Sequence, residues 1–176
     1  MKFMLDTNAY NELLDNDISV KELNGEFFTT HIPKDELNNT KKEERRKQLN
    51  AKFKEVHQKE IPTELGVYGI SRYGKCKFVS ADVPTESFVL DTSRLDYAKV
   101  GDSSVYQKLL NSLEKAKPKD EGNIKDALIG ETAVKNEFVL VTKDVALQNA
   151  VKEYSPDAQV INFAKFIEVL KNESRI

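Results

Sequence analysis

The sequence predicts an α/β fold in which a central, mostly parallel β-sheet is flanked by helices. Two short apolar runs, residues 3–5 (Phe-Met-Leu) and residues 138–141 (Phe-Val-Leu-Val), have the composition of strands buried on both faces. Each run is followed by polar residues and then by a segment of helical periodicity, an order of elements typical of α/β sheets. The length of 176 residues suits one domain with its own core, so we expect a single domain over 1–176.

The first predicted strand delivers Asp6 to the carboxyl end of the sheet. In open α/β sheets, ligands bind in the crevice at that end. We expect Thr7 or Asn8 to cap the next helix, which begins near Ala9 and runs to Leu14. An aspartate after a strand is also an ordinary capping or turn residue, so this position alone does not identify a site.

Two later segments repeat this arrangement. Asp144 follows the strand predicted at 138–141 and precedes an amphipathic helix. Glu36 follows a strand predicted at 27–30 and lies in a helix whose first turn contains Pro33. The sequence therefore predicts acidic side chains after three strands of one sheet.

A further acidic position lies within a predicted helix. Over residues 126–133 the helical period places Asp126 on one face with Gly130 and Ala133. We expect these small residues to let that face lie close to the sheet, which brings Asp126 toward the strand ends. Glu131, on the same helix, is either a support for the site or a surface residue.

Taken together, Asp6, Glu36, Asp126 and Asp144 resemble the acidic signature of the PIN-domain nucleases, a family that includes the VapC-type toxin ribonucleases. The resemblance covers roughly residues 1–38 and 103–165 and implies a Rossmann-like PIN fold with Mg²⁺- or Mn²⁺-dependent cleavage of RNA. The matching motifs, in order, are Leu5-Asp6-Thr7-Asn8, Glu36-Leu37, Lys125-Asp126-Ala127-Leu128-Ile129 with Thr132-Ala133, and Val141-Thr142-Lys143-Asp144.

The resemblance also implies roles for these residues. Asp6, Asp126 and Asp144 would bind the metal ion, and Glu36 would complete the catalytic acidic set. Carboxylates gathered in one crevice raise each other's pKa, and a divalent cation held by hard oxygen ligands resolves that conflict. Asn8 and Thr142 would orient these carboxylates through hydrogen bonds.

Several functions remain open at this point. The leading hypothesis is a metal-dependent endoribonuclease that acts as the toxin of a toxin-antitoxin pair, with RNA as substrate, a protein antitoxin as partner and a homodimer as the assembly. The alternative is a PIN-like RNA-processing subunit outside such a pair, or a nucleic-acid-binding or scaffold subunit. A phosphatase of the haloacid type is disfavoured because Asn8 stands where its second aspartate is needed.

Composition excludes several other classes. The single Cys76 cannot form an internal disulfide, and two histidines, His31 and His57, are too few for a histidine-rich zinc site. No apolar run approaches the length of a membrane span, and the N-terminus lacks the pattern of a signal peptide, so we expect a cytoplasmic protein. The net charge of −2 argues against a generic basic nucleic-acid binder.

Basic residues are nevertheless concentrated between residues 41 and 60, which hold eight Lys or Arg and four Glu and have the pattern of a helix. The simpler interpretation is a solvated helix face with Glu-Lys pairs. The other is an arm that follows RNA phosphates, with Arg45 and Arg46 as candidates. The predicted apolar stripe consists of Leu49, Phe53 and Val56.

An internal repeat follows, because residues 61–78 align with residues 83–100 through a shared Pro-Thr-Glu and Ser-Arg pattern. We expect two related β-hairpin units, which with the basic helix form an insertion over 39–102. Arg72 and Arg94 occupy equivalent positions in the two copies. They either reach substrate or a partner, or pair with glutamates within each unit.

The remaining segments complete the predicted order of elements. Residues 103–116 have a helical period, and a break precedes the helix of Asp126. Asp120 lies in this break, where it either joins the site or complements the start of the helix. A strand at 160–162 and a helix at 163–170 close the chain.

Overall fold

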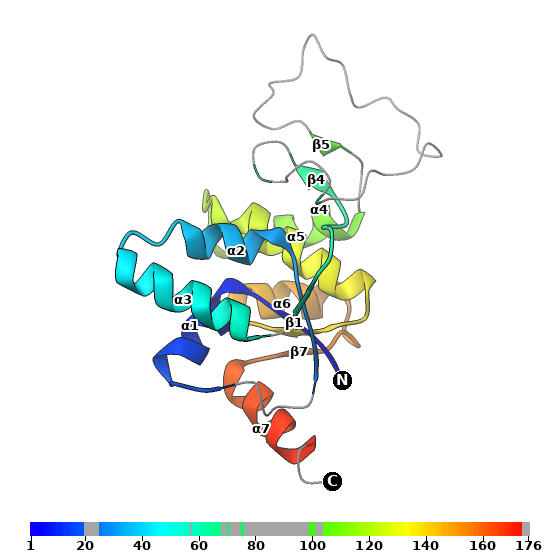
Figure 1. The fold of residues 1–176 in the computed structure, drawn as a ribbon. Helices are drawn as coiled ribbons and strands as arrows, with labels where there is room; N and C mark the ends of the chain where they lie inside the picture. The colour runs from blue at the N-terminus through cyan, green and yellow to red at the C-terminus, as the bar shows by residue number, and fades with distance from the viewer. Residues whose placement is uncertain are drawn as a thin grey trace.

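The computed structural model describes residues 1–19, 25–56, 58–67, 70, 75, 99–100 and 104–173. Its helices and strands follow the predicted α/β order along the chain (Figure 1). In chain order they are β1 (Lys2–Leu5), α1 (Thr7–Asp15), β2 (Glu26–Thr29), α2 (His31–Asn38), α3 (Glu43–Glu55), β3 (Gln58–Glu60), β4 (Gly66–Val67), β5 (Lys99–Val100), α4 (Ser104–Ala116), α5 (Gly122–Lys135), β6 (Val139–Val141), α6 (Val145–Tyr154), β7 (Val160–Ile161) and α7 (Phe163–Glu173).

The central sheet has five strands in the order β3-β2-β1-β6-β7, and all four pairings are parallel. The chain begins in the middle strand, where Phe3 pairs with Phe27 of β2 on one side and with Val139 of β6 on the other. The strand order therefore reverses between β1 and β6. This is the topological switch point, at which open α/β sheets bind their ligands. The predicted fold class is confirmed.

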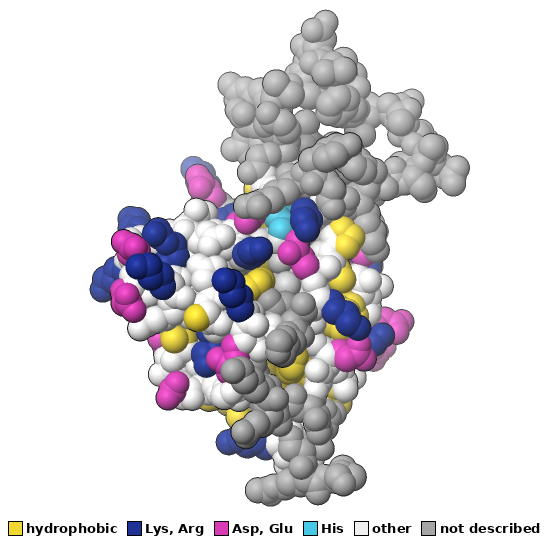
Figure 2. All heavy atoms as spheres, in the orientation of Figure 1, with side chains coloured by type: hydrophobic (Ala, Val, Ile, Leu, Met, Phe, Trp, Pro, Cys, Tyr) yellow, Lys and Arg dark blue, Asp and Glu magenta, His cyan; other side chains and the backbone are white. Residues whose placement is uncertain are grey.

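The basic helix is shorter than predicted. α3 ends at Glu55, and Gln58–Glu60 forms the edge strand β3, which pairs with β2 through Phe27 and Gln58. Its apolar stripe of Leu49, Phe53 and Val56 is buried as expected. On the surface of α2 and α3, basic and acidic side chains intermix, as in the Glu43–Lys47 pair at 2.9 Å (Figure 2).

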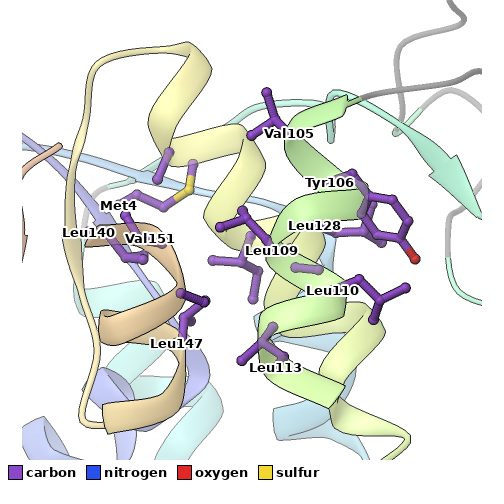
Figure 3. Close-up of a cluster of buried hydrophobic side chains, with 14 of the residues drawn as sticks. Met4, Val105, Tyr106, Leu109, Leu110, Leu113, Leu128, Leu140, Leu147 and Val151 are labelled. Carbon is purple, nitrogen blue, oxygen red and sulfur yellow. The ribbon is translucent and has the colours of Figure 1, made fainter. Parts of the chain in front are cut away.

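Alternation along β1 divides the hydrophobic core into two layers. Phe3 and Leu5 pack on one face of the sheet with residues of α1, α3 and α7, whereas Met4 packs on the other face. That second layer is formed by α4, α5 and α6, whose leucines lie against one another (Figure 3). Side chains of both layers are buried, so the sheet is covered on both faces.

Gly130 permits close packing, but of a different kind from the one predicted. A Cβ atom at Gly130 would lie 3.2 Å from Leu109 Cδ1 of α4 and 3.2 Å from Leu147 Cδ1 of α6. The absent side chain thus brings α5 against two helices, and the expected approach of this face to the sheet is wrong for Gly130. The packing still fixes α5, and with it Asp126, beside the switch point.

Much of the predicted insertion lies outside the described residues. β4 and β5 form an antiparallel pair, with Gly66 opposite Val100. Most of the remainder of the repeat, including Arg72 and Arg94, is not among the described residues, so the hairpin units and the boundaries 39–102 stay predictions. Among the helices described, none combines the length and apolar character that a bilayer crossing requires.

Candidate functional site

Asp6 is the residue at which β1 ends and α1 begins. Its backbone is extended, with φ −82° and ψ 177°, and its Oδ1 accepts a hydrogen bond from the Ala9 amide at 2.9 Å. The helix cap is therefore Asp6 itself, and the prediction that Thr7 or Asn8 caps α1 is wrong. Asp6 is therefore both the last residue before the helix and one of the four predicted acids, and it is only 3% exposed.

Asp144 has the same position after β6 as Asp6 has after β1. Its Oδ1 accepts from the Ala146 amide at 2.8 Å and the Leu147 amide at 3.3 Å, which caps α6. Its own amide donates to Thr142 Oγ1 at 3.0 Å. The two strand ends are joined by the Asp6 amide, which donates to the Val141 carbonyl at 3.3 Å, so both caps lie at the switch point.

Asp126 approaches the two strand-end acids from α5. The Lys117 ammonium donates to Asp144 Oδ2 and lies 4.0 Å from Asp126 Oδ2. The Asp126 side chain is 26% exposed and that of Asp144 is 12% exposed. A single lysine therefore contacts both carboxylates from a position partly open to solvent.

Glu36 reaches the same place from α2. Thr7, the residue after Asp6, donates from its hydroxyl to Glu36 Oε2. Lys125, the residue before Asp126, contacts Glu36 Oε1 at 3.1 Å. A pocket of about 290 Å³ opens beside Glu36 and Lys125.

We call the four carboxylates Asp6, Glu36, Asp126 and Asp144 the acidic ring. Side chains outside the ring contact its carboxylates. Thr7 and Lys125 both contact Glu36, and Lys117 contacts Asp144 and Asp126. The structure thus brings all four predicted acids to the carboxyl edge of the sheet.

Burial raises the pKa of two members of the ring. Desolvation is the largest cause of a pKa of about 6 at Asp6, although hydrogen bonds from Thr142, the Ala9 amide and Asn8 act in the opposite direction. The pKa of Asp126 is raised to about 7, first by desolvation and next by the negative charge of Asp144. These two carboxylates are thus costly to ionise where they stand.

Asp144 behaves differently. Desolvation again acts to raise its pKa, but the hydrogen bond from Lys117 and the amides of Ala146 and Leu147 outweigh it, so that the pKa lies below its ordinary value. For Lys117, desolvation acts to lower the pKa, but contacts with Asp144 and Asp126 outweigh it and the pKa is raised. The Lys117–Asp144 pair is therefore fully charged at neutral pH.

The chemistry of the ring suits a hard divalent cation, which prefers carboxylate oxygens and retains water ligands. As the side chains stand, no three Asp, Glu, His or Cys side chains among the described residues are grouped closely enough to hold a metal ion. Lys117 contacts Asp126 and Asp144, and one oxygen of Asp6 is used by the Ala9 amide. Binding of an ion therefore requires the carboxylates and Lys117 to change their contacts.

The two residues predicted to orient the acids lie beside them. Asn8 Nδ2 is 3.4 Å from Asp6 Oδ2, and Thr142 lowers the pKa of Asp6 by hydrogen bonding. The catalytic and metal-binding roles of the ring, and the orienting roles of Asn8 and Thr142, remain predictions.

Other candidates from the sequence serve local structure. Arg45 pairs with Asp15 of α1 at 2.7 Å, in agreement with the ion-pair interpretation of the basic helix. Asp120 Oδ1 accepts from the Gly122 amide at 2.8 Å and so supports the start of α5. Glu131 is fully buried and pairs with Lys135 at 2.9 Å, so its interpretation as a surface residue is wrong. Arg46 lies on α3.

Sequence reasoning missed three residues that contact the ring. Thr7 follows Asp6 and Lys125 precedes Asp126 in the sequence. These adjacent positions could have identified both residues as candidates for contact with the ring. Lys117 gave no comparable signal, because it follows the last residue of α4 and belongs to no recognised motif.

Comparison with family models and with curated proteins gives no match to this chain. Among solved structures, the chain is similar to the crystal structure of VapBC2 from Rickettsia felis bound to a DNA fragment from their promoter. The TM-score is 0.47 and the sequence identity 17%, over 92% of this chain and 98% of that chain. A similarity of this degree is too low to assign a function.

Proposed function

We propose that this protein is a Mg²⁺- or Mn²⁺-dependent endoribonuclease of the PIN-domain type. The observation that supports this most strongly is the convergence of four carboxylates at the switch point of a parallel sheet, two of them with raised pKa values. Buried carboxylates that are costly to ionise favour a bound cation, and a divalent cation is one that can promote phosphodiester hydrolysis.

Asp6 and Asp126 are the proposed principal ligands of the ion, and Asp144 completes the set. When bound, Mg²⁺ or Mn²⁺ supplies Lewis-acid stabilisation of the negative charge that develops on phosphate oxygens. The cap bonds from Ala9, Ala146 and Leu147 fix one oxygen of Asp6 and one of Asp144, which limits the orientations of both carboxylates.

Glu36 is proposed to act at the substrate side of the ring. It is held by Thr7 and Lys125 and adjoins the pocket of about 290 Å³, where part of a nucleotide would find space. From this position its carboxylate would accept a hydrogen bond from the attacking water, which helps to orient that water toward phosphorus.

The direct test is incubation of purified protein with total cellular RNA in Mg²⁺, in Mn²⁺ and in EDTA, followed by mapping of the cut ends. Cleavage in either metal, absent in EDTA and absent in Asp126→Asn, is the expected result. Cleavage that persists in EDTA, or in folded Asp126→Asn, would contradict the proposed site.

The resemblance of the acidic motifs to VapC-type ribonucleases extends the proposal to a toxin with a protein antitoxin. Induced expression of the wild-type chain in a bacterial host should then arrest growth, whereas Asp6→Asn should not. Relief of the arrest by the product of an adjacent small gene would identify the antitoxin. Normal growth with abundant folded, RNA-cleaving protein would favour an RNA-processing nuclease instead.

One observation favours a second candidate, a nucleic-acid-binding or scaffold subunit without catalysis. Lys117 and Lys125 already balance the charge of Asp144 and Glu36, so half of the ring is stable without a metal ion. A chain that binds RNA but cleaves none of it in Mg²⁺ or Mn²⁺ would match this alternative.

A further inference from the structure

Lys117 contacts two members of the acidic ring at once. Its ammonium donates to Asp144 Oδ2 and lies 4.0 Å from Asp126 Oδ2, and its side chain is 35% exposed. The ammonium thus provides positive charge to the two carboxylates whose mutual repulsion helps to raise the pKa of Asp126. Solvent can reach the lysine from the outer side.

The main chain holds Lys117 firmly in this position. Its amide donates to the Leu113 carbonyl at 2.7 Å, which continues the hydrogen bonding of α4 by one residue. Its carbonyl accepts from Asn123 Nδ2 at 2.7 Å, and Asn123 is almost completely buried. The backbone of Lys117 is therefore anchored from both α4 and α5, and its side chain extends from this fixed point to the ring.

Other lysines near the ring make different contacts. Lys125 pairs with Glu36 at 3.1 Å, and Lys143 is an exposed side chain that pairs with Glu12 of α1 at 2.6 Å. Within the part of the chain that the structure describes, Lys117 is the lysine whose ion pairs link two acids of the ring, Asp126 and Asp144. This makes Lys117 the lysine placed to compete with a divalent ion.

We propose that Lys117 is a built-in counter-cation that occupies the region between Asp126 and Asp144 in the metal-free protein and is displaced when a divalent ion binds. This inference rests on the proposed metal-dependent function and adds to it a residue that sets the affinity for the metal. Lys117 is a positioning residue here: it holds the carboxylates together without metal and must release them for the ion.

The physical consequence is a competition between two cations for the same oxygens. The ion gains access only to the fraction of molecules in which the lysine has left, so the apparent dissociation constant rises by the inverse of that fraction. A partly exposed ion pair shifts such an equilibrium by a factor of up to about five. The contact with Asp126, at 4.0 Å, adds less than the contact with Asp144, so we expect a total effect of about five- to tenfold.

The test is Mn²⁺ binding at pH 7.5, measured by the electron paramagnetic resonance signal of free Mn²⁺. Lys117→Met should lower the dissociation constant about five- to tenfold relative to wild type. Lys117→Arg, which keeps the charge, should stay near wild type. Lys125→Met is the matched control, because it removes an equally exposed lysine from Glu36 alone, and it should change the constant less than twofold.

A second measurement uses the wild-type protein and does not depend on the stability of any variant. In an NMR titration with Mg²⁺ that observes lysine side-chain nitrogens, the Lys117 signal should move toward the position of a free lysine. The Lys143 signal should remain unchanged, because its pair with Glu12 lies outside the ring.

The outcomes separate this inference from the proposed function. Equal or weaker Mn²⁺ binding by folded Lys117→Met, or a Lys117 signal that Mg²⁺ does not move, would overturn the role of Lys117 while leaving the metal site in place. Absence of Mn²⁺ binding in wild type and in Lys117→Met, or binding that survives in Asp126→Asn, would overturn the proposed site and this inference together.

Discussion

The acidic ring consists of two halves that balance their charge in different ways. Asp6 and Asp126 are desolvated, and burial is the main cause of pKa values of about 6 and about 7. Asp144 and Glu36 have close lysine partners, whereas Lys117 lies 4.0 Å from Asp126, and the hydrogen bond from Lys117 helps to hold the pKa of Asp144 below its ordinary value. We call Asp6 and Asp126 the desolvated half of the ring, because burial makes them costly to ionise. We call Asp144 and Glu36 the compensated half, because close lysines balance their negative charge.

This difference indicates where a divalent ion would gain the most free energy. An ion near Asp6 and Asp126 removes the cost of ionising two buried carboxylates, whereas at Asp144 it only replaces the charge that Lys117 already supplies. Functional sites often carry such costs in the unbound state, because the groups are arranged for a ligand and not for the stability of the fold. Substitutions in the two halves should therefore have unequal effects.

The largest effect is expected from substitutions in the desolvated half. Asp6→Asn and Asp126→Asn each remove a proposed ligand, so RNA cleavage in Mg²⁺ or Mn²⁺ should fall at least about 100-fold. In Asp6→Asn the amide oxygen of the new side chain can still cap α1, so circular dichroism should show an unchanged fold. Asp15→Asn, at the exposed end of the same helix, is the control and should retain activity. Full activity of folded Asp6→Asn would contradict the assignment.

Asp126→Asn, which abolishes a proposed metal ligand, should at the same time stabilise the metal-free protein. The native pKa of about 7 lies above the ordinary value of 3.8, so the native state holds more protons than the unfolded state between these values. The contribution of Asp126 to the free energy of unfolding therefore falls as pH rises from about 4 to about 7. The difference between the two pKa values corresponds to about 4 kcal/mol of unfolding free energy. Solvent screening of this partly exposed side chain reduces the expected contribution to about 2 kcal/mol.

Urea unfolding in EDTA measures this effect. At pH 7.5, Asp126→Asn should be more stable than wild type by about 2 kcal/mol, and the advantage should disappear near pH 4. Asp15→Asn should give no such gain, because its pair with Arg45 holds the pKa of Asp15 below its ordinary value. An Asp126→Asn protein that is less stable than wild type at pH 7.5 would show that Asp126 carries no desolvation cost.

A smaller effect is expected in the compensated half. Glu36→Gln keeps the size of the side chain and an oxygen that can accept from Thr7, but removes the charge that Lys125 balances. We expect cleavage to fall about tenfold, as for residues that support a metal site without holding the ion directly. A loss as large as that of Asp126→Asn would make the two halves of the ring equivalent.

The smallest effect is expected at Thr7. Thr7→Val removes the hydroxyl that donates to Glu36 while preserving the shape of the side chain. The loss of one partly exposed hydrogen bond should cost about 1 kcal/mol of stability or less and reduce cleavage by a few-fold. Thermal unfolding and cleavage rates check both values, with Thr40→Val, in the loop after α2, as a control that should change neither.

The sequence was sufficient to predict the sheet where apolar runs are short and buried. The runs that include Phe3 and Val139 became adjacent parallel strands, and each delivered its aspartate to the switch point as expected. The cap of α1 was misassigned because Asp-Thr-Asn offers three side chains that can cap a helix, and the sequence pattern does not say which of them does.

Strand β3 and the position of Lys117 could not be predicted from apolar periodicity or from sequence motifs. The edge strand β3 consists of Gln-Lys-Glu, so its place in the sheet depends on backbone pairing with β2 and not on apolar periodicity. The position of Lys117 depends on the turn that joins α4 to α5, and Asn123, the second residue of α5, holds that turn by donating to the Lys117 carbonyl. Such contacts are set by tertiary packing, which a single sequence does not reveal.

The central claim is that a divalent ion binds at the acidic ring through its desolvated half. Calorimetric titration of Mg²⁺ into wild type, Asp126→Asn and Asp15→Asn tests this most directly. We predict one binding event in wild type and in Asp15→Asn, and none in Asp126→Asn. Unchanged binding in folded Asp126→Asn, or no binding in any of the three proteins, would contradict the claim.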